Sequence, residues 1–317
     1  MNDRNPNLQF IFFVALFVSA FTAPISLLAA FNQGAETCQK CHSAEHTVWE
    51  QTRHFASFRE AHKNPKAKDI LAAVGGSTNM KANQTCTLCH YTMVQESAEA
   101  QAVAKSGTSC ESCHGASSGW FSVHNDYGGT SVTKETETPE HKTKRIADAE
   151  AAGWIHPGKK YDIAMNCMNC HGLAHSGLDG DTLAKMLGAG HPINPNFELV
   201  QYSQGTVRHR FYPPDTTVNA EMTKPELARM FVTGQAAKLV SATQAMSKSS
   251  DASYQEAQKK RLEDAKAVLS AVKSVPEAAQ LIANPAEESA RGLVAAIADK
   301  DLSSEVGSLL PDPASYK

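Results

Sequence analysis

Four copies of the pattern Cys-x-x-Cys-His use every cysteine in this chain of 317 residues. The copies are Cys38-Gln-Lys-Cys41-His42, Cys86-Thr-Leu-Cys89-His90, Cys110-Glu-Ser-Cys113-His114 and Cys167-Met-Asn-Cys170-His171. Cysteines at this spacing lie on one helical turn, where both sulfurs can form thioethers, and the next residue can present an imidazole to iron. This is the attachment pattern of c-type haem. The sequence therefore predicts four covalently bound haem c groups, held by these eight cysteines and ligated by the four motif histidines.

Two other uses of paired cysteines explain the pattern less well. Zinc is bound by four thiolates or by three thiolates and one imidazole, and neither set needs a histidine directly after every second cysteine. Disulfides between cysteines three residues apart would close very small rings, and they also leave the adjacent histidines unexplained.

The first thirty residues have the pattern of an export signal. Arg4 lies in a short polar start, an apolar run extends from Leu8 to Ala23, and Leu27-Leu28-Ala29-Ala30 follows. Export suits covalent haem attachment, so we expect a periplasmic protein. A cut directly after Ala29 or Ala30 would put Leu27 or Leu28, and not a small residue, at the third position before the cut, and the apolar stretch from Leu8 to Phe31 is 24 residues long. An uncleaved anchor in the cytoplasmic membrane is therefore the alternative to a cleaved signal peptide.

Composition divides the remaining chain near residue 222. Residues 31–222 hold all thirteen histidines among many Gly, Pro, Asn and Asp, the texture of a loop-rich multihaem domain with a haem-filled core. Residues 223–317 are rich in Ala, Lys, Glu and Leu and contain no Cys, His or Trp. We expect a mainly α protein, with a tetrahaem cytochrome c domain over 31–222 followed by a C-terminal helical bundle over 223–317.

Local signals place several helices. Thr223 can cap a helix with Pro225 in its first turn, and Asp251 can cap another. Pro276 and the Asn284-Pro285 step divide the remainder. Between the two central motifs, which lie close together in sequence, we expect only a connecting helix from Met93 to Ala104.

Nine histidines lie outside the motifs and compete for the second ligand position of each iron. His46 and His175 each follow a motif histidine by four residues, so on a continuing helix they lie on the proximal side and cannot reach the far face of their own haem. His54, about 18 Å along a helix from His42, can reach a different haem, and Phe55 and Phe58 beside it suit a ring edge. His62 is a weaker alternative to His54.

Three further histidines are candidate ligands. His124 lies in an apolar run after the third motif, and His191 and His209 follow the fourth motif, beside Pro192 and Phe211 respectively. His141, among charged residues, is expected to be solvated, and His156-Pro157-Gly158 reads as a turn. The predicted iron ligands are thus His42, His90, His114 and His171 together with His54, His124, His191 and His209.

These features resemble the tetrahaem cytochrome c-554 family. The likeness rests on the first motif followed by Trp49 and Arg53-His54-Phe-Ala, on Gly107-Thr-Ser ahead of the third motif, and on the order of the motifs. The resemblance implies that His54 ligates the iron of His114 and that His124 ligates the iron of His42. It also implies an open distal side at the haem of His90, although the chain departs from the family after the fourth motif, where two late histidines could close that site.

The leading hypothesis is an exported electron carrier that moves single electrons between redox proteins. The resemblance implies a donor such as a hydroxylamine-oxidising enzyme. The alternative is a haem reductase of small nitrogen or sulfur oxides at an open haem of His90, and a third hypothesis is a haem filament, which the helical tail would obstruct. A formal charge of −3 gives no general attraction to nucleic acid.

Overall fold

The computed structural model describes residues 29–317, and within them the fold is mainly helical, as the sequence predicts. The described elements up to residue 222 are α1 (Ala35–Gln39), α2 (Ser43–Glu50), α3 (Arg53–Glu60), α4 (Ala67–Val74), α5 (Gln84–His90), β1 (Thr92–Val94), β2 (Val103–Ser106), α6 (Cys110–His114), α7 (Phe121–His124), α8 (Pro139–Ala151), α9 (Lys160–His171), α10 (Gly180–Gly188) and α11 (Leu199–Ser203). The later helices are α12 (Lys224–Met246), α13 (Ala252–Leu269), α14 (Pro276–Ala283), α15 (Glu287–Ala296) and α16 (Ser303–Val306).

The C-terminal helices begin where their capping residues predict. The Thr223 hydroxyl accepts a hydrogen bond from the backbone N–H of Glu226, and the Glu226 carboxylate accepts one from the N–H of Thr223 at 2.8 Å. This reciprocal arrangement satisfies two N–H groups that a helix start leaves free. Asp251 caps α13 by accepting from the N–H of Tyr254 at 2.9 Å. Pro276 opens α14, and the Asn284-Pro285 step separates α14 from α15, also as expected.

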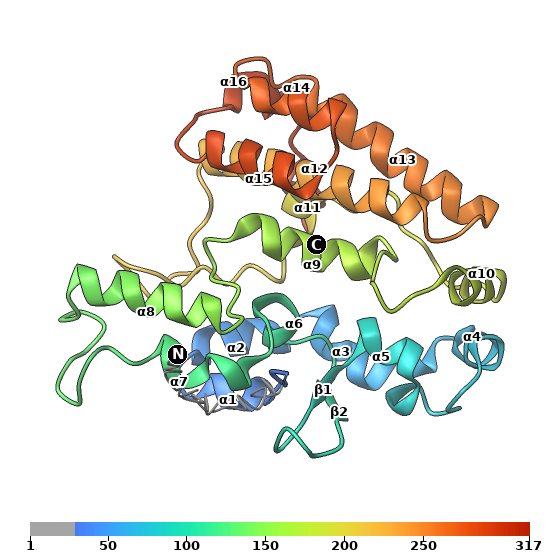
Figure 1. The fold of residues 1–317 in the computed structure, drawn as a ribbon, viewed down its shortest axis with the longest axis horizontal. Coiled ribbons are helices and arrows are strands. Elements are labelled where there is room, and N and C mark those ends of the chain that lie inside the picture. Colours follow the sequence, from blue (N-terminus) through green and yellow to red (C-terminus); the bar gives the residue numbers. More distant parts are fainter. Residues whose placement is uncertain (1–28) are drawn as a thin grey trace, which may run out of the picture.

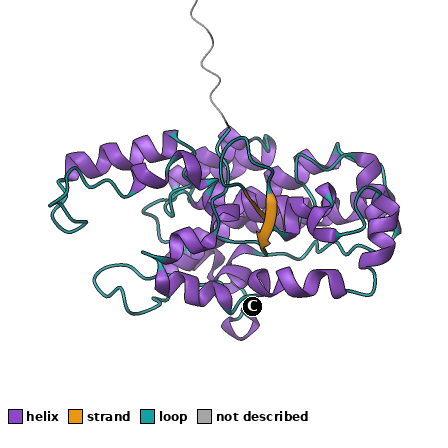
Figure 2. Ribbon diagram, turned by 90° about the horizontal axis from the view of Figure 1, so that it is seen from below, coloured by secondary structure: helices purple, strands orange, loops and turns teal. Residues whose placement is uncertain are grey.

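The segment between the second and third motifs is a β-hairpin, so the connecting helix expected over 93–104 is wrong. Strands β1 and β2 pair antiparallel (Figure 2), with Met93 opposite Ala104. The strands are too short to show a clear alternation, and contacts distant in sequence hold them in place. Thr92 donates from its hydroxyl to the carbonyl of Gly107, and Val94 forms a parallel bridge with Asn32.

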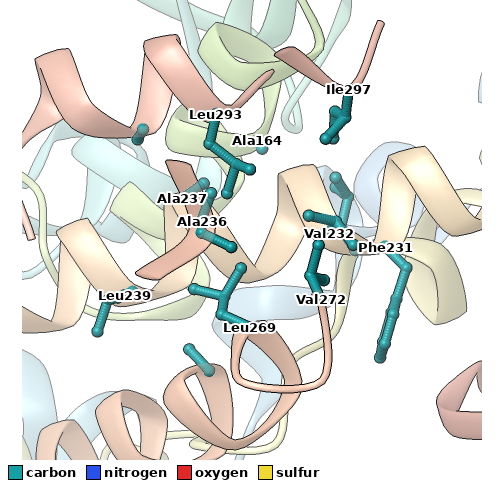
Figure 3. Packing of buried hydrophobic residues seen from close by; sticks show 14 of the residues in the cluster. Ala164, Phe231, Val232, Ala236, Ala237, Leu239, Leu269, Val272, Leu293 and Ile297 are labelled. Carbon is teal, nitrogen blue, oxygen red and sulfur yellow. The ribbon is translucent and has the colours of Figure 1, made fainter. Parts of the chain in front are cut away.

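Helix α9, which carries the fourth motif, lies between two layers (Figure 1). On one side it packs against α12, and on the other against α5 and α6. The main hydrophobic core follows this arrangement, because it joins Ala164 and Met168 of α9 to Leu239 of α12, Leu269 of α13 and Leu293 of α15 (Figure 3). Each of the three leucines is fully buried, which stabilises the fold by about 1.5–3 kcal/mol apiece.

The core therefore includes residues on both sides of position 222. The division of the chain into a haem domain and a separate helical domain stays a prediction. The predicted N-terminal signal or anchor lies almost wholly outside the described residues. Among residues 29–317, no helix combines the length and apolar character needed to cross a bilayer.

Candidate haem sites

Each motif lies on or at the end of a helix, as the spacing predicts. The second, third and fourth motifs end α5, α6 and α9 with their histidines, while the first begins in α1 and finishes in the turn after it. In that turn the N–H of His42 donates to the carbonyl of Cys38 at 3.0 Å, so the first motif also closes one helical turn. The eight cysteines form no disulfides.

The structure brings each motif histidine opposite one other histidine. The distances between ring centroids are 6.5 Å for His42 and His124, 6.1 Å for His171 and His54, 6.2 Å for His90 and His191, and 6.4 Å for His114 and His209. These eight side chains are the eight iron ligands that the sequence predicts. The pairing uses each of them once.

The separations suit a metal between two imidazoles. Two metal–nitrogen bonds of about 2.0 Å in line, with roughly 1 Å more from each nitrogen to its ring centre, give a centroid separation of about 6 Å. Rings that only pack against each other would not be expected to have nearly the same centroid separation in all four pairs. The residues present therefore fit bis-histidine ligation of iron at all four motifs.

Backbone carbonyl groups hold one nitrogen of several of these rings. Nδ1 of His124 lies 2.5 Å from the carbonyl oxygen of Phe121, Nδ1 of His191 lies 2.9 Å from that of Pro192, and Nδ1 of His209 lies 2.6 Å from that of Val207. Nδ1 of the motif histidine His114 lies 2.9 Å from the carbonyl oxygen of Ile155. A carbonyl on Nδ1 favours the tautomer whose Nε2 has a free lone pair, the form that binds a metal.

Burial keeps most of these imidazoles neutral. It lowers the pKa of His90, His114 and His171 to about 4, and it also lowers the pKa of His54 and His191. Removal from water disfavours the imidazolium ion, so these rings are uncharged at neutral pH. His42 differs, because the Glu45 carboxylate, 3.6 Å from its Nδ1, raises its pKa.

One pairing differs from that implied by the family resemblance. His54 lies against His171 of the fourth motif and not against His114 of the third. Its helix, α3, packs against α5 and β2, whereas the partner of His114 comes from the loop before α12. The pairing of His124 with His42 is the one that the resemblance implies.

The motif helices follow one another in space in an order different from their order in sequence. Helix α1 packs against α6, α6 against α9, and α9 against α5. Cysteine side chains of neighbouring motifs also lie close together in this order. A hydrogen bond with Cys110 raises the pKa of Cys38, a hydrogen bond with Cys89 raises that of Cys170, and Cys113 lies near enough to Cys170 to be affected by its charge. The first and second motifs are thus at the two ends of the row (Figure 1).

The other histidines lie apart from these pairs. His46 is buried against Trp49, and neither of its ring nitrogens is hydrogen-bonded. Nδ1 of His175 and Nδ1 of His156 accept hydrogen bonds from the N–H groups of Gly177 and Gly158, the second forming the expected turn. Nδ1 of His141 lies 2.7 Å from the Glu137 carboxylate.

Two charged residues that support the sites were not predicted. The buried Glu111, inside the third motif, accepts hydrogen bonds from the backbone N–H groups of Gln33, Gly34 and Ser117 at 2.8 to 2.9 Å. It thereby fixes the start of α1 to α6. In the sequence, the one signal for this role was a charged side chain between the two cysteines of a motif.

The second is Arg261 of α13, which is 1% exposed and has no carboxylate partner within residues 29–317. Its guanidinium donates to the side chains of Gln258 and Ser241 and lies against Gly172, directly after the fourth motif. Nothing in the periodicity of α13 distinguished this arginine from a solvent-exposed one.

Residues 37–115 match the protein family described as cytochrome c554 and c-prime. No curated protein and no solved structure matches the chain. The matched segment contains the first three motifs and His54, and the fourth motif and the other three predicted non-motif ligands lie beyond it. Over this part of the chain, the sequence is similar to c-type cytochromes.

Proposed function

From a chain whose residues 37–115 match the cytochrome c554 and c-prime family, we propose an exported tetrahaem cytochrome that carries single electrons between a periplasmic or membrane-bound redox partner and a downstream acceptor. The observation that carries the proposal is the set of four opposed histidine pairs, each 6.1 to 6.5 Å between ring centroids. Haem bound in this way supplies reversible one-electron chemistry at an iron with no free coordination position.

The chain's part in this function is to hold the ligands and to fix the spacing of the sites. The row α1, α6, α9, α5 supports a continuous path from the first motif to the second, because each motif helix touches the next. Buried, neutral imidazoles and the carbonyl groups on Nδ1 keep the ligand geometry constant when the charge at the site changes. Such preorganisation suits a carrier.

The alternative, reduction of small oxides at an open haem of His90, needs a free coordination position. His191 lies 6.2 Å from His90, and its Nδ1 is held by the carbonyl of Pro192. This observation supports a carrier over a reductase.

The test is the spin state of the purified, oxidised protein. We expect haem analysis to give four haems per chain, and electron paramagnetic resonance and visible spectra to show low-spin haem only, with no carbon monoxide adduct after reduction. A high-spin signal equivalent to one haem would favour the reductase. A haem count below four would contradict the tetrahaem assignment.

A further inference from the structure

One end of the row of motifs has a charge opposite to that of the rest of the chain. Residues 53–90 contain six Lys or Arg and two Asp or Glu, a net charge of +4. Since the whole chain has a formal charge of −3, the remaining residues have a net charge of −7. The segment contains the second motif, at the α5 end of the row.

Five of these cations form what we call the basic face: Arg59, Lys63, Lys66, Lys68 and Lys81. All but Lys81 are exposed. Within the part of the chain that the structure describes, none has a carboxylate within salt-bridge distance. The acidic side chains nearest in sequence are Glu60 and Asp69, and on the adjoining α10 Asp181 is paired with Lys185 at 2.6 Å.

Packing holds the basic face around the second motif. Phe58, Ala61 and Leu71 pack on a small core formed by Met80, Cys86 and Tyr91. The ammonium group of Lys81 lies 3.4 Å from the centre of the Phe58 ring. These contacts bring the end of α3, the start of α4 and the turn before α5 onto one side of the His90 site.

The basic face also reaches the partner of His90. The side chain of Lys66 lies over Gly190, with carbons 3.5 Å from the position that a Cβ there would occupy. Gly190 precedes His191, and both His90 and His191 are only half-buried. The basic face therefore adjoins a terminal site that approaches the surface.

The opposite end of the row has a different character. Around the His42 and His124 pair, Glu45 faces His42, and Arg145 is held by the Glu137 carboxylate through two hydrogen bonds of 2.7 Å. Lys144 is paired with Asp148 on the same helix. Several charges at this end are thus paired within the chain.

We propose that the basic face is the docking surface for an acidic redox protein, which exchanges electrons with the cytochrome at the His90 end of the row. The inference rests on the proposed function and extends it to one partner class. Complementary charge raises the rate of encounter and orients the partner, and here it would direct a ring of carboxylates to the end of the row. An acidic surface would be repelled by most of the rest of this chain.

The test is stopped-flow reduction of the oxidised holoprotein by a reduced, acidic plant-type ferredoxin at low ionic strength. The variant Lys63→Glu/Lys68→Glu is compared with Lys134→Glu/Lys142→Glu, which changes the net charge equally through exposed lysines outside the basic face. We expect the first variant to slow the second-order rate about ten-fold or more and the control to change it less than two-fold. At high salt the difference should disappear, since screening shortens the range of the field.

Equal slowing by both variants would overturn the proposal, because net charge alone would then explain the rates. No slowing by either variant would overturn it as well. Sedimentation with vesicles of phosphatidylcholine and phosphatidylglycerol forms a second arm. If Lys63→Glu/Lys68→Glu abolishes vesicle binding but leaves the ferredoxin rate unchanged, the face binds lipid and the proposal fails. The low-spin spectrum of each variant tests the proposed function separately.

Discussion

At the residue scale, the pair formed by His90 and His191 decides between carrier and catalyst. The two residues lie on elements far apart in the sequence and meet at 6.2 Å between ring centroids. Replacing His191 should open one coordination position and leave the other three pairs intact, because no other pair shares a residue with it. With the proposed ligation, the reactivity of the protein toward small ligands would depend on His191.

We expect His191→Ala to convert one haem of the four to the high-spin form and to bind one equivalent of carbon monoxide after reduction, measured by electron paramagnetic resonance and visible spectroscopy. His175→Ala is the control, because His175 is half-buried and its contact is a hydrogen bond from Gly177. A His191→Ala protein that stays fully low-spin would show that His191 is not the ligand.

Arg261 permits a second prediction at this scale. The guanidinium is buried among neutral partners, so an apolar side chain of similar volume should replace it at a cost below about 1 kcal/mol, or with a gain. Arg261→Ala should cost about 2–5 kcal/mol, since it leaves a cavity against Gly172. Urea denaturation followed by circular dichroism distinguishes the two. If Arg261→Met is the more damaging change, the charge itself stabilises the fold.

At the element scale, α12 is the helix that joins the layers. It packs against α9, α11, α13 and α15, and its middle is buried on all sides. Gly234 permits the close approach of α11, because a Cβ there would lie 2.6 Å from the Cβ of Leu199. The small side chains Ala236 and Ala237 continue this tightly packed region.

We therefore expect Gly234→Ala to destabilise the protein by about 1–3 kcal/mol through overpacking. The matched control is Gly292→Ala on α15, where a Cβ meets nothing within 4 Å. There the change should stabilise the helix by about 0.5–1 kcal/mol, the usual difference between Gly and Ala in a helix. Thermal unfolding midpoints of the two variants should move in opposite directions, and equal shifts would contradict the packing argument.

The sequence predicts those elements that depend on nearby residues and misses those that depend on distant contacts. The starts of α12 and α13 depend on capping residues within four positions, so local pattern was sufficient. The hairpin of β1 and β2 depends on Asn32 and Gly107, outside its own strands, and was missed. The eight histidines that form the four pairs could be selected by residue type and neighbours. Their pairing could not, because it depends on which helices pack together, and the family resemblance gave a different partner for His54.

At the scale of the whole molecule, the core that joins α9 to the C-terminal helices predicts that the part of the chain before residue 223 depends on residues 223–317 for its folding. Deletion of residues 223–317 would expose the apolar face of α9, including Ala164 and Met168, which are at most 1% exposed. We expect the truncated protein to aggregate or to lose its haem complement, measured by size-exclusion chromatography and haem analysis.

The matched control is the full chain cut by a protease in the exposed segment 212–218, after an inserted recognition site. The cut breaks the peptide chain but leaves the packing of α9 against the C-terminal helices unchanged. The two fragments should therefore stay together and keep the low-spin spectrum. A monomeric truncated protein with four haems would instead support the division at 222 into independent domains.

The four histidine pairs have a consequence for how the chain can be assembled. If each pair were joined through one metal, the four links would connect residues 42 and 124, 54 and 171, 90 and 191, and 114 and 209. Each of the four chain segments between linked residues contains residues 114–124. Because these segments all overlap, a chain that ends before residue 171 contains both members of only one pair. A chain that emerges from its N-terminus can close none of these links until the second residue of that pair, at 124, 171, 191 or 209, has appeared. An exported chain halted between 124 and 171 could close one of these links, while His54, His90 and His114 would still lack their partners, a state exposed to proteolysis.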